Sequence, residues 1–520
     1  MGCLMASTLN ADVLAERARL TPEREAILDL GSDERLTYRE LDRRVDRVAA
    51  ALIHQLGLHV GDRVAVLSDN SLRYVEFFFA AVRSGLVLVN INTHLAAPEI
   101  SGVLVDSGAE VLLCGAPYAE LAGERRGALT APQLRRRLLL EGSEGESLDI
   151  YIKASAERPA PRHHAAPDDT CALIYTSGTT GKPKGVMLTQ QMFGWNAINT
   201  VIGWRLRDDD VTSVFTPLYH AAGFGVFLLP LFSIGGRVVL HRRFDAEEVL
   251  RTLATERVTV VLGVPTIFKR LSEHPLFGEL DLGALRWAIS GGAPLPRYLI
   301  DRYGEAGVVL KQGFGMTEAG VNCFAMSCAE ATAKAGSIGR PLPFTEARVV
   351  DPQGSPLPAN EVGRLQLRGP HLCKGYWENS QATADAFDAQ GFFDTGDLAR
   401  VDDEGYFYIA GREKDMYISG GVNVYPAELE AALLAHPGVL DAAVVGVPDV
   451  RWGEAGVAFV VRRDGEGEPV SEAQLRAALG QRLARYKLPK ELRFVDDLPR
   501  TDYGKIRKDA LRQEYGSDDD

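Results

Sequence analysis

The chain has 520 residues and a formal net charge of −13, from 57 basic and 70 acidic side chains. Single hydrophobic cores stop growing well below this length, so several domains are expected. The acidic balance argues against nucleic acid or an anionic membrane as the main partner. An anionic ligand would therefore need a local cationic site.

Cysteine content and hydropathy indicate the cellular compartment in which the protein works. Six cysteines are scattered without Cys-x-x-Cys spacing, which is too sparse for a disulfide framework and fits a reducing cytoplasm. The most apolar long stretch, residues 226–240, is interrupted by Pro230 and Arg237 and is too short to span a bilayer. We expect a cytoplasmic protein without stable membrane insertion, and the sequence leaves its oligomeric state open.

The first part of the chain alternates helical and strand patterns. Thr37 is placed as a helix N-cap, and Glu40 completes a capping box. The apolar run 64–67 predicts a buried strand, residues 74–84 predict a helix, and residues 87–91 predict another strand. Strands that alternate with helices indicate βαβ units and largely parallel sheets.

Composition changes mark the later boundaries. Residues 157–169 are rich in proline and polar side chains and predict a surface connector. A second βαβ-like region runs from about 170 to 330, and short strands between Gly, Pro and Asp turns in 336–410 predict a small antiparallel or barrel-like unit.

The C-terminal tail has helix and strand signals of its own. Pro426 suits the first position of a helix, and residues 436–438 end that helix. Strands are predicted at 440–447 and 455–462, and Ser471 opens another helix. A tail of this size is expected to form a small α+β domain.

The expected fold class is therefore α/β. We expect a large N-terminal domain, residues 1–412, with subdomains at about 1–169, 170–335 and 336–410. The first two are βαβ-type, the third is β-barrel-like, and a small mobile α+β domain follows at 413–520.

A glycine-rich loop follows the apolar run 171–175. Residues 176–185 contain four hydroxyl groups, three glycines and two lysines. Glycines allow backbone N–H groups to approach a ligand, and such turns form anion-binding concavities. The spacing of Gly178 and Gly181 does not fit a Walker A loop. A flexible linker is the alternative, but it does not explain two lysines in a chain with only 12. We expect a polyphosphate-binding loop.

Four further segments accompany this loop. They span residues 312–318, 393–397, 411–421 and 498–507, and each contains glycine beside charged or hydroxyl side chains. Each segment alone is a weak signal, because Thr-Gly-Asp is a common turn and Gly-Lys a common surface pair. Together, in this order over more than 300 residues, they are hard to attribute to chance.

On these five segments the chain resembles the acyl-adenylating superfamily, and residues 418–430 look most like its acyl- and aryl-CoA ligases. The resemblance covers nearly the whole chain. It implies two steps: a carboxylic acid and MgATP form an acyl adenylate and pyrophosphate, and the thiol of CoA then displaces AMP. The implied cofactor and co-substrates are Mg²⁺, ATP and CoA.

The resemblance also implies roles for single residues. Thr317 contacts the α-phosphate, Glu318 binds Mg²⁺, Asp397 accepts hydrogen bonds from the ribose hydroxyls, and Arg412 approaches ribose and phosphate. Lys505, on the small domain, bridges the acyl carboxylate and the α-phosphate. The loop that holds the β- and γ-phosphates comprises Thr176, Ser177, Gly178, Thr179, Thr180, Gly181, Lys182 and Lys184.

The adenine site and the second half-reaction are implied in the same way. In this family the small domain rotates between the steps, and Lys414 matches the hinge. Gly420 and Gly421 are expected to line the CoA channel, with Trp452 nearby. The positions that match the adenine and phosphate segments are Gly292, Ala293, Pro294, Gly313, Phe314, Gly315, Met316 and Thr317.

The chemical class of the acid can be predicted only from the types of residue expected in its pocket. His220 matches the position that shields the acyl carboxylate, although a buried structural histidine is an even competitor. The cavity has no evident cation for a second carboxylate, so an apolar monocarboxylic acid is expected, with an aryl acid (benzoate- or anthranilate-like) narrowly favoured over a medium-chain acid. The residues expected to shape this pocket are His220, Phe224, Gly263, Val264, Gly291 and Val321.

Two other functions stay open at this point. The acyl group could pass to the phosphopantetheine of an acyl carrier protein instead of CoA. The chain could also bind a nucleotide without catalysis, although the presence of both Glu318 and Lys505 speaks against that.

Overall fold

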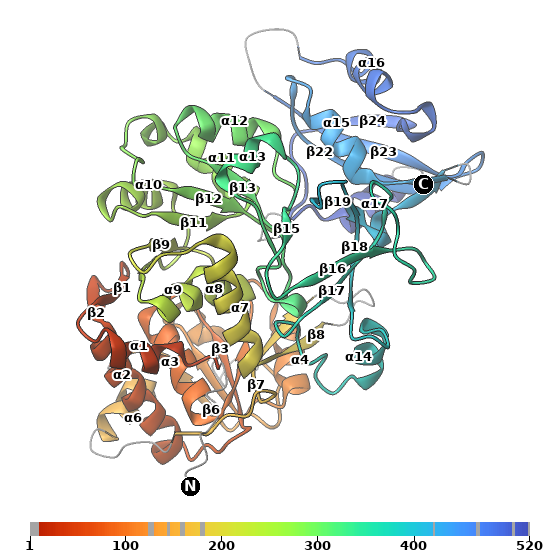
Figure 1. Ribbon diagram of the computed structural model, residues 1–520. Coiled ribbons are helices and arrows are strands. Elements are labelled where there is room, and N and C mark those ends of the chain that lie inside the picture. Colours follow the sequence, from red (N-terminus) through yellow and green to blue (C-terminus); the bar gives the residue numbers. More distant parts are fainter. Residues whose placement is uncertain are drawn as a thin grey trace.

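The computed structural model describes residues 10–122, 129–142, 146–155, 162–176, 183–419, 422–463, 469–501 and 505–517. Two mainly parallel sheets and their helices form the large N-terminal part, and the small C-terminal part lies at one end (Figure 1). In the described residues, no helix is both long and apolar enough to cross a membrane.

The first sheet has seven strands. Its strands pair in parallel except for the antiparallel hairpin formed by the last two. In spatial order they are β13 (Leu310–Gln312), β12 (Trp287–Ser290), β11 (Val260–Gly263), β9 (Val211–Val214), β10 (Arg237–Leu240), β1 (Glu25–Asp29) and β2 (Glu34–Thr37).

The second sheet has six strands and is parallel except for its final hairpin. Strands 64–67 and 87–91 of the sequence prediction correspond to its third and fourth members. In spatial order they are β6 (Arg136–Leu139), β5 (Val111–Cys114), β3 (Arg63–Leu67), β4 (Val87–Asn90), β7 (Thr170–Thr176) and β8 (Lys184–Thr189).

Helices fill the space between the two sheets and cover their outer faces. The largest apolar core contains side chains of both sheets together with those of the intervening helices, and one smaller core lies on the outer face of each sheet. The inner helices are α1 (Val13–Leu20), α2 (Tyr38–Ala50), α3 (Leu72–Ser84), α7 (Gln190–Trp204), α8 (Ala221–Gly223) and α9 (Leu229–Ile234). The outer helices are α10 (Ala246–Thr255), α11 (Pro265–Glu273) and α12 (Arg297–Glu305) on the first sheet and α4 (Ala97–Ser107) and α5 (Ala119–Ala122) on the second. Helix α6 (Leu148–Ala154) packs beside α2 at the edge of the inner core.

The predicted start of helix α2 is confirmed by its N-terminal cap. Thr37 caps α2, and the reciprocal bonds with Glu40 form the expected capping box. Such a cap satisfies backbone N–H groups that have no partner within the helix. The apolar face of α2 then packs into the core between the sheets.

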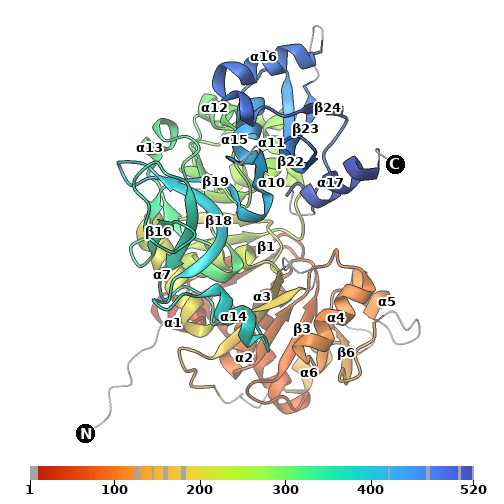
Figure 2. The same ribbon diagram turned by 90° about the vertical axis from the view of Figure 1, so that its right-hand side faces the viewer.

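The predicted antiparallel unit is a four-stranded sheet with β16 and β19 at its edges. It lies beside the large sheets (Figure 2). Its strands are β16 (Glu346–Val350), β17 (Gly363–Arg368), β18 (Phe393–Val401) and β19 (Phe407–Arg412), and the neighbouring elements are β14 (Phe324–Ala325), β15 (Arg340–Pro341), α13 (Cys328–Ala333) and α14 (Ser380–Ala386).

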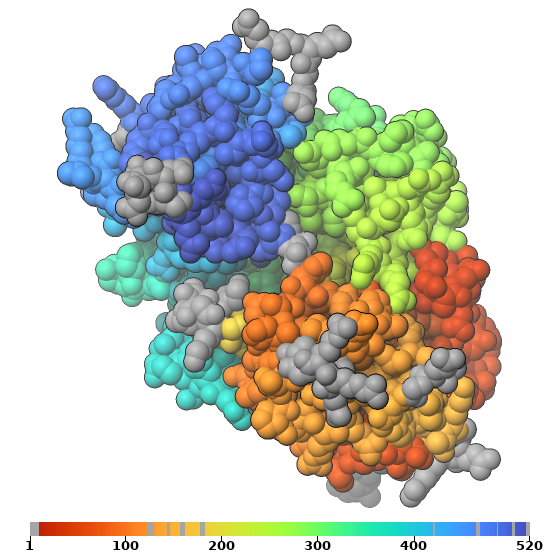
Figure 3. Space-filling model, turned by 180° about the vertical axis from the view of Figure 1, so that it is seen from behind, coloured from red at the N-terminus to blue at the C-terminus, as the bar shows by residue number. Residues whose placement is uncertain are grey.

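The C-terminal part is a five-stranded sheet with helices on both faces, which agrees with the predicted α+β unit. Seen from behind, it lies against the part of the chain that contains α10 to α12 (Figure 3). The strands are β20 (Tyr417–Ser419), β21 (Val422–Val424), β22 (Val439–Asp449), β23 (Gly453–Arg462) and β24 (Glu491–Val495), and the helices are α15 (Pro426–Leu434), α16 (Glu472–Arg482) and α17 (Lys508–Ser517).

One buried side chain, Asn70, joins the two large sheets near their carboxyl edges. It follows β3, and its amide nitrogen donates to the backbone oxygens of Thr216 and His241 at 3.1 Å each. Its Oδ1 accepts from the backbone N–H of Leu218 at 2.7 Å. The loop after β9, which leads to His220, is therefore held by a residue of the other sheet.

We expect Asn70→Ala to lower the free energy of unfolding by about 2–4 kcal/mol, because it leaves three buried backbone groups without their partner. The measurement is the urea midpoint of the first unfolding transition, compared with wild type. An unchanged midpoint would show that Asn70 does not hold this loop.

Candidate active site

The glycine-rich loop connects an antiparallel hairpin. Thr176 ends β7 and Lys184 begins β8, and the two residues are register partners. The hairpin thus brings a hydroxyl group and an ammonium group to the two ends of the loop. The residues Ser177, Gly178, Thr179, Thr180, Gly181 and Lys182 lie outside the described residues, so their predicted phosphate contacts stay a prediction.

Glu318 is buried beside this hairpin. The hydroxyl of Thr176 donates to its Oε1 at 3.3 Å, and the hydroxyl of Tyr376 donates to the same oxygen at 3.4 Å. Burial raises the pKa of the Glu318 carboxyl, and the two hydroxyl groups oppose that shift. A bound cation would favour the ionised form.

Tyr376 is a site residue that sequence reasoning missed. Besides its bond to Glu318, its ring lies under the ammonium of Lys184, with Nζ 5.0 Å from the ring centroid. It therefore links the carboxylate to the hairpin that bears the loop. A single tyrosine outside the glycine motifs gives no pattern in the sequence that would have identified it.

The glycine segments 291–294 and 313–316 follow the carboxyl ends of β12 and β13. Parallel strands end at one edge, where ligands bind in open α/β sheets. Gln312 fixes the first segment by accepting from Leu295 N at 2.6 Å and donating to Ala293 O at 3.2 Å. A Cβ at Gly315 would lie 2.1 Å from the carbonyl oxygen of Val321, so only glycine fits there. The described members are Gly291, Gly292, Ala293, Pro294, Gly313, Phe314, Gly315 and Met316, with Thr317 next in the chain.

Asp397 and Arg412 face each other on the antiparallel sheet. They are register partners on β18 and β19, and Arg412 Nε lies 3.2 Å from Asp397 Oδ1. Burial raises the pKa of the Asp397 carboxyl, and Arg412 and then Lys505 oppose the shift. The sequence-predicted pair is thus brought together by strand register.

Lys505 reaches this cleft from the C-terminal domain. A Cβ at Gly292 would lie 3.9 Å from Cε of Lys505, and mutual bonds to Thr501 hold the lysine's backbone. The Lys505 side chain is partly exposed to solvent. Many protein atoms nevertheless surround its ammonium, and this burial lowers the pKa of Lys505. Arg412 adds to that lowering, whereas Asp397 and Glu318 oppose it. A bound anion would favour the charged ammonium.

His220 is the N-cap residue of α8. Burial, and then the positive charge of Lys505, lower the pKa of His220 to about 3. The imidazole is therefore neutral at pH 7. The effect of Lys505 on this pKa shows that the two side chains lie within electrostatic range of each other.

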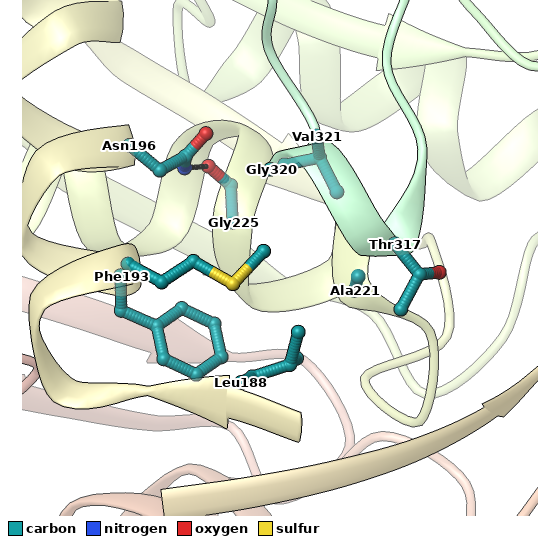
Figure 4. Close-up of a pocket in the computed structure, with 9 residues that line it drawn as sticks. Leu188, Phe193, Asn196, Ala221, Gly225, Thr317, Gly320 and Val321 are labelled. Atoms are coloured by element: carbon teal, nitrogen blue, oxygen red, sulfur yellow. Dashed lines mark hydrogen bonds between the residues drawn. The ribbon is translucent and has the colours of Figure 1, made fainter. Parts of the chain in front are cut away.

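A small apolar cavity borders the same region. Its volume is about 10 Å³, room for about one water molecule. Of the pocket residues expected from sequence, Val321 lines it; Phe224 instead points into the core, where its ring stacks on Phe78 at 4.2 Å. The lining comprises Leu188, Met192, Phe193, Asn196, Ala221, Gly225, Thr317, Gly320 and Val321 (Figure 4).

Other predicted site residues are placed as follows. Gly263 ends β11, and Val264 follows as the N-cap of α11. Lys414 lies in a short 3₁₀ turn just after β19 and is close enough to lower the pKa of Lys505. Trp452 is exposed between β22 and β23 with the Arg451 guanidinium over its ring. Gly420 and Gly421 lie outside the described residues.

The donor set fits Mg²⁺ held together with phosphate. In the described part of the chain, no group of three or more His, Cys, Asp or Glu side chains could cage a metal. Mg²⁺ in nucleotide sites needs only one or two carboxylates, because phosphates and water complete its shell. The buried carboxylate of Glu318 beside the glycine-rich loop fits such a role, which stays a prediction.

Comparison with known proteins agrees with this geometry. The family model of the AMP-binding enzymes matches residues 14–377, and that of the AMP-binding enzyme C-terminal domain matches residues 428–505. The chain belongs to the AMP-binding enzyme family, on its acid–CoA ligase branch. Its nucleotide and thiol co-substrates are accordingly ATP and CoA, with Mg²⁺ as the metal.

Individual relatives match nearly the whole chain. A feruloyl-CoA synthase from Amycolatopsis sp is 43% identical over 96% of this chain and 98% of its own length. The long-chain-fatty-acid–CoA ligase FadD13 from Mycobacterium tuberculosis is 38% identical over 97% and 98%. Among solved structures, ATP-bound MatB from Rhodopseudomonas palustris superposes with a TM-score of 0.88 at 34% identity, covering 97% and 99% of the two chains.

The pKa of His220 gives a pH prediction. Its native value of about 3 lies below the ordinary 6.5, so the unfolded chain binds a proton here that the native enzyme does not. The stabilisation is present above pH 6.5 and is lost as the pH falls through the window from 6.5 to 3. Between pH 6.5 and 4.5, wild type should lose up to about 2 kcal/mol more stability than His220→Gln. Urea unfolding at both pH values measures this, and equal losses would refute a buried neutral imidazole.

Proposed function

We propose that this ligase activates an apolar aryl carboxylic acid with ATP and transfers the acyl group to CoA in the cytoplasm. The observation that supports the mechanism is the position of one ammonium. Lys505, from the C-terminal domain, lies against Gly292 and within the fields of Asp397, Glu318 and His220 on the large domain.

The chemistry needs cations in this cleft. A carboxylate is a weak nucleophile, and its attack on the α-phosphorus of ATP brings two anions together. Fixed positive charge in a site of low dielectric lowers that barrier, together with positioning of the two reactants. Lys505 would bridge the carboxylate oxygen and the α-phosphate, and the hydroxyl of Thr317 would donate to the same phosphate.

Other groups hold the nucleotide. Asp397, paired with Arg412 at 3.2 Å, would accept hydrogen bonds from the ribose hydroxyls. Lys184 and the loop after Thr176 would hold the β- and γ-phosphates, and Glu318 would bind the metal. Mg²⁺, when bound, supplies positive charge that neutralises the phosphates. The adenylate forms as pyrophosphate leaves.

In the second step the CoA thiol attacks the acyl carbon and AMP leaves. A single lysine cannot serve both steps from one position if it blocks the thiol's approach, so we propose that the small domain turns about Lys414. His220, neutral at pH 7, would shield the acyl carboxylate without adding a competing charge. Gly420, Gly421 and the exposed Trp452 would then border the CoA channel.

The substrate class rests on two supports. The nine described residues that line the cavity near Thr317 include no charged side chain, which favours a monocarboxylic acid with an apolar body. The relative at 43% identity is named for an aryl acid, and the relative at 38% for long-chain fatty acids. Together these favour an aryl acid over a medium-chain acid.

The test is the Lys505→Ala variant, assayed with CoA and with a carrier-protein phosphopantetheine as alternative thiols. Acid-dependent pyrophosphate exchange should fall by about 10²–10³-fold, because a charge contact made in the transition state is removed. Transfer from a supplied acyl adenylate to CoA should stay within about threefold of wild type, and CoA should outcompete the carrier protein.

Lys490→Ala is the matched control, since Lys490 is a small-domain lysine paired only with Asp449 among the ion pairs of the described residues. It should leave both half-reactions unchanged. If Lys505→Ala leaves pyrophosphate exchange intact, the proposed role of Lys505 fails. If no acid on an aryl and C4–C16 panel supports exchange in wild type, the proposed function fails.

A further inference from the structure

A short segment of the chain, residues 373–377, joins Glu318 to the strand that follows the glycine-rich loop. The segment runs along β8, the edge strand of its sheet, where Met187 N donates to Gly375 O at 2.9 Å. At the start of the segment, Cys373 N donates to Glu318 O at 2.7 Å. The backbone of Glu318 and the backbone of β8 are therefore held by the same five residues.

Tyr376 is the residue of this segment whose side chain contacts both partners. Its hydroxyl donates to Oε1 of Glu318 at 3.4 Å, and the centroid of its ring lies 5.0 Å from Nζ of Lys184. Its own backbone N–H donates to the hydroxyl of Thr383 on α14 at 2.9 Å. The tyrosine is thus fixed through its backbone, while its hydroxyl contacts an acidic group and its ring contacts a basic group.

The two contacts of Tyr376 are chemically independent. A phenolic hydroxyl donates a hydrogen bond that orients a carboxylate, whereas the face of the ring attracts an ammonium through its quadrupole. The hydroxyl of Thr176 also donates to Oε1 of Glu318, at 3.3 Å. Both hydroxyl groups therefore bond to one carboxylate oxygen, and neither of them occupies Oε2.

We propose that Tyr376 is a positioning residue with two separable roles in the binding of MgATP. Its hydroxyl orients the Glu318 carboxylate for Mg²⁺, and its ring holds the Lys184 ammonium in place for the phosphates. This inference rests on the proposed function, which assigns the metal to Glu318 and the phosphates to Lys184. A group that hydrogen-bonds a metal ligand sets the orientation of that ligand and thereby its affinity for the metal.

The test measures dissociation constants by calorimetry in the absence of acid, for MgATP and for ATP in excess EDTA. Tyr376→Phe keeps the ring and removes the hydroxyl, so the Kd of MgATP should rise about three- to tenfold, as for one lost hydrogen bond. The Kd of metal-free ATP should stay within about 1.5-fold of wild type, because no metal ligand has to be oriented. Tyr376→Leu also removes the ring, so it should bind metal-free ATP about three- to fivefold more weakly than Tyr376→Phe does.

Two controls separate positioning from a general effect on the fold. Tyr408 makes the same kinds of contact elsewhere: its hydroxyl donates to Asp402 at 3.2 Å, and the Arg400 guanidinium carbon lies 4.2 Å from its ring centroid. Tyr408→Phe should leave both dissociation constants unchanged. In a Glu318→Ala background, Tyr376→Phe should no longer weaken MgATP binding, because the carboxylate that the hydroxyl orients has been removed.

Three results would overturn the inference. One is a Tyr376→Phe variant that binds MgATP like wild type, or that loses affinity for MgATP and metal-free ATP equally. Another is a Tyr376→Phe effect that persists in the Glu318→Ala background. The third is equal binding of metal-free ATP by Tyr376→Leu and Tyr376→Phe. If Tyr376→Leu fails to fold, Tyr376→Met, which also lacks an aromatic ring, replaces it in this comparison. Absence of ATP binding by the wild-type enzyme would instead refute the proposed function, and the inference with it.

Discussion

The site depends on several charged side chains, two acidic and two basic, that lie together in one cleft from which water is partly excluded. Burial disfavours the charged forms of Glu318, Asp397 and Lys505. Their mutual attraction offsets part of that penalty, and Arg412 stabilises Asp397 while it opposes Lys505. An anionic nucleotide with a divalent cation supplies the missing opposite charges. The electrostatics of the protein alone therefore favour a ligand of that kind.

Three separate parts of the chain build this cleft. The parallel sheet contributes glycine turns at the carboxyl ends of β12 and β13, and the antiparallel sheet contributes the register pair Asp397 and Arg412. The C-terminal domain contributes Lys505. Because the lysine belongs to a domain with its own core, it can leave the cleft without unfolding the nucleotide site. This arrangement suits two reactions that need different groups at the same place.

Sequence reasoning found what local pattern determines. Capping predicted the start of α2, and apolar runs predicted β3 and β4. The glycine motifs pointed to Asp397 and Lys505, which the fold brings to one cleft. Tyr376, which lies under Lys184 and acts through single long-range contacts, was missed. Phe224 was predicted to shape the acid pocket; its ring stacks on Phe78 in the core between the sheets, and its contact with the acid stays a prediction.

The most direct measurement of the central claim traps the small domain where it now lies. The Arg463 guanidinium carbon is 5.0 Å from the Tyr298 ring centroid across the two domains, so Tyr298→Cys and Arg463→Cys can be joined by a short bismaleimide, with Cys3 and Cys328 replaced by serine. The cross-linked enzyme should keep acid-dependent pyrophosphate exchange and lose acyl transfer from a supplied adenylate to CoA. Full transfer activity in the trapped enzyme, or loss of exchange, would contradict the account.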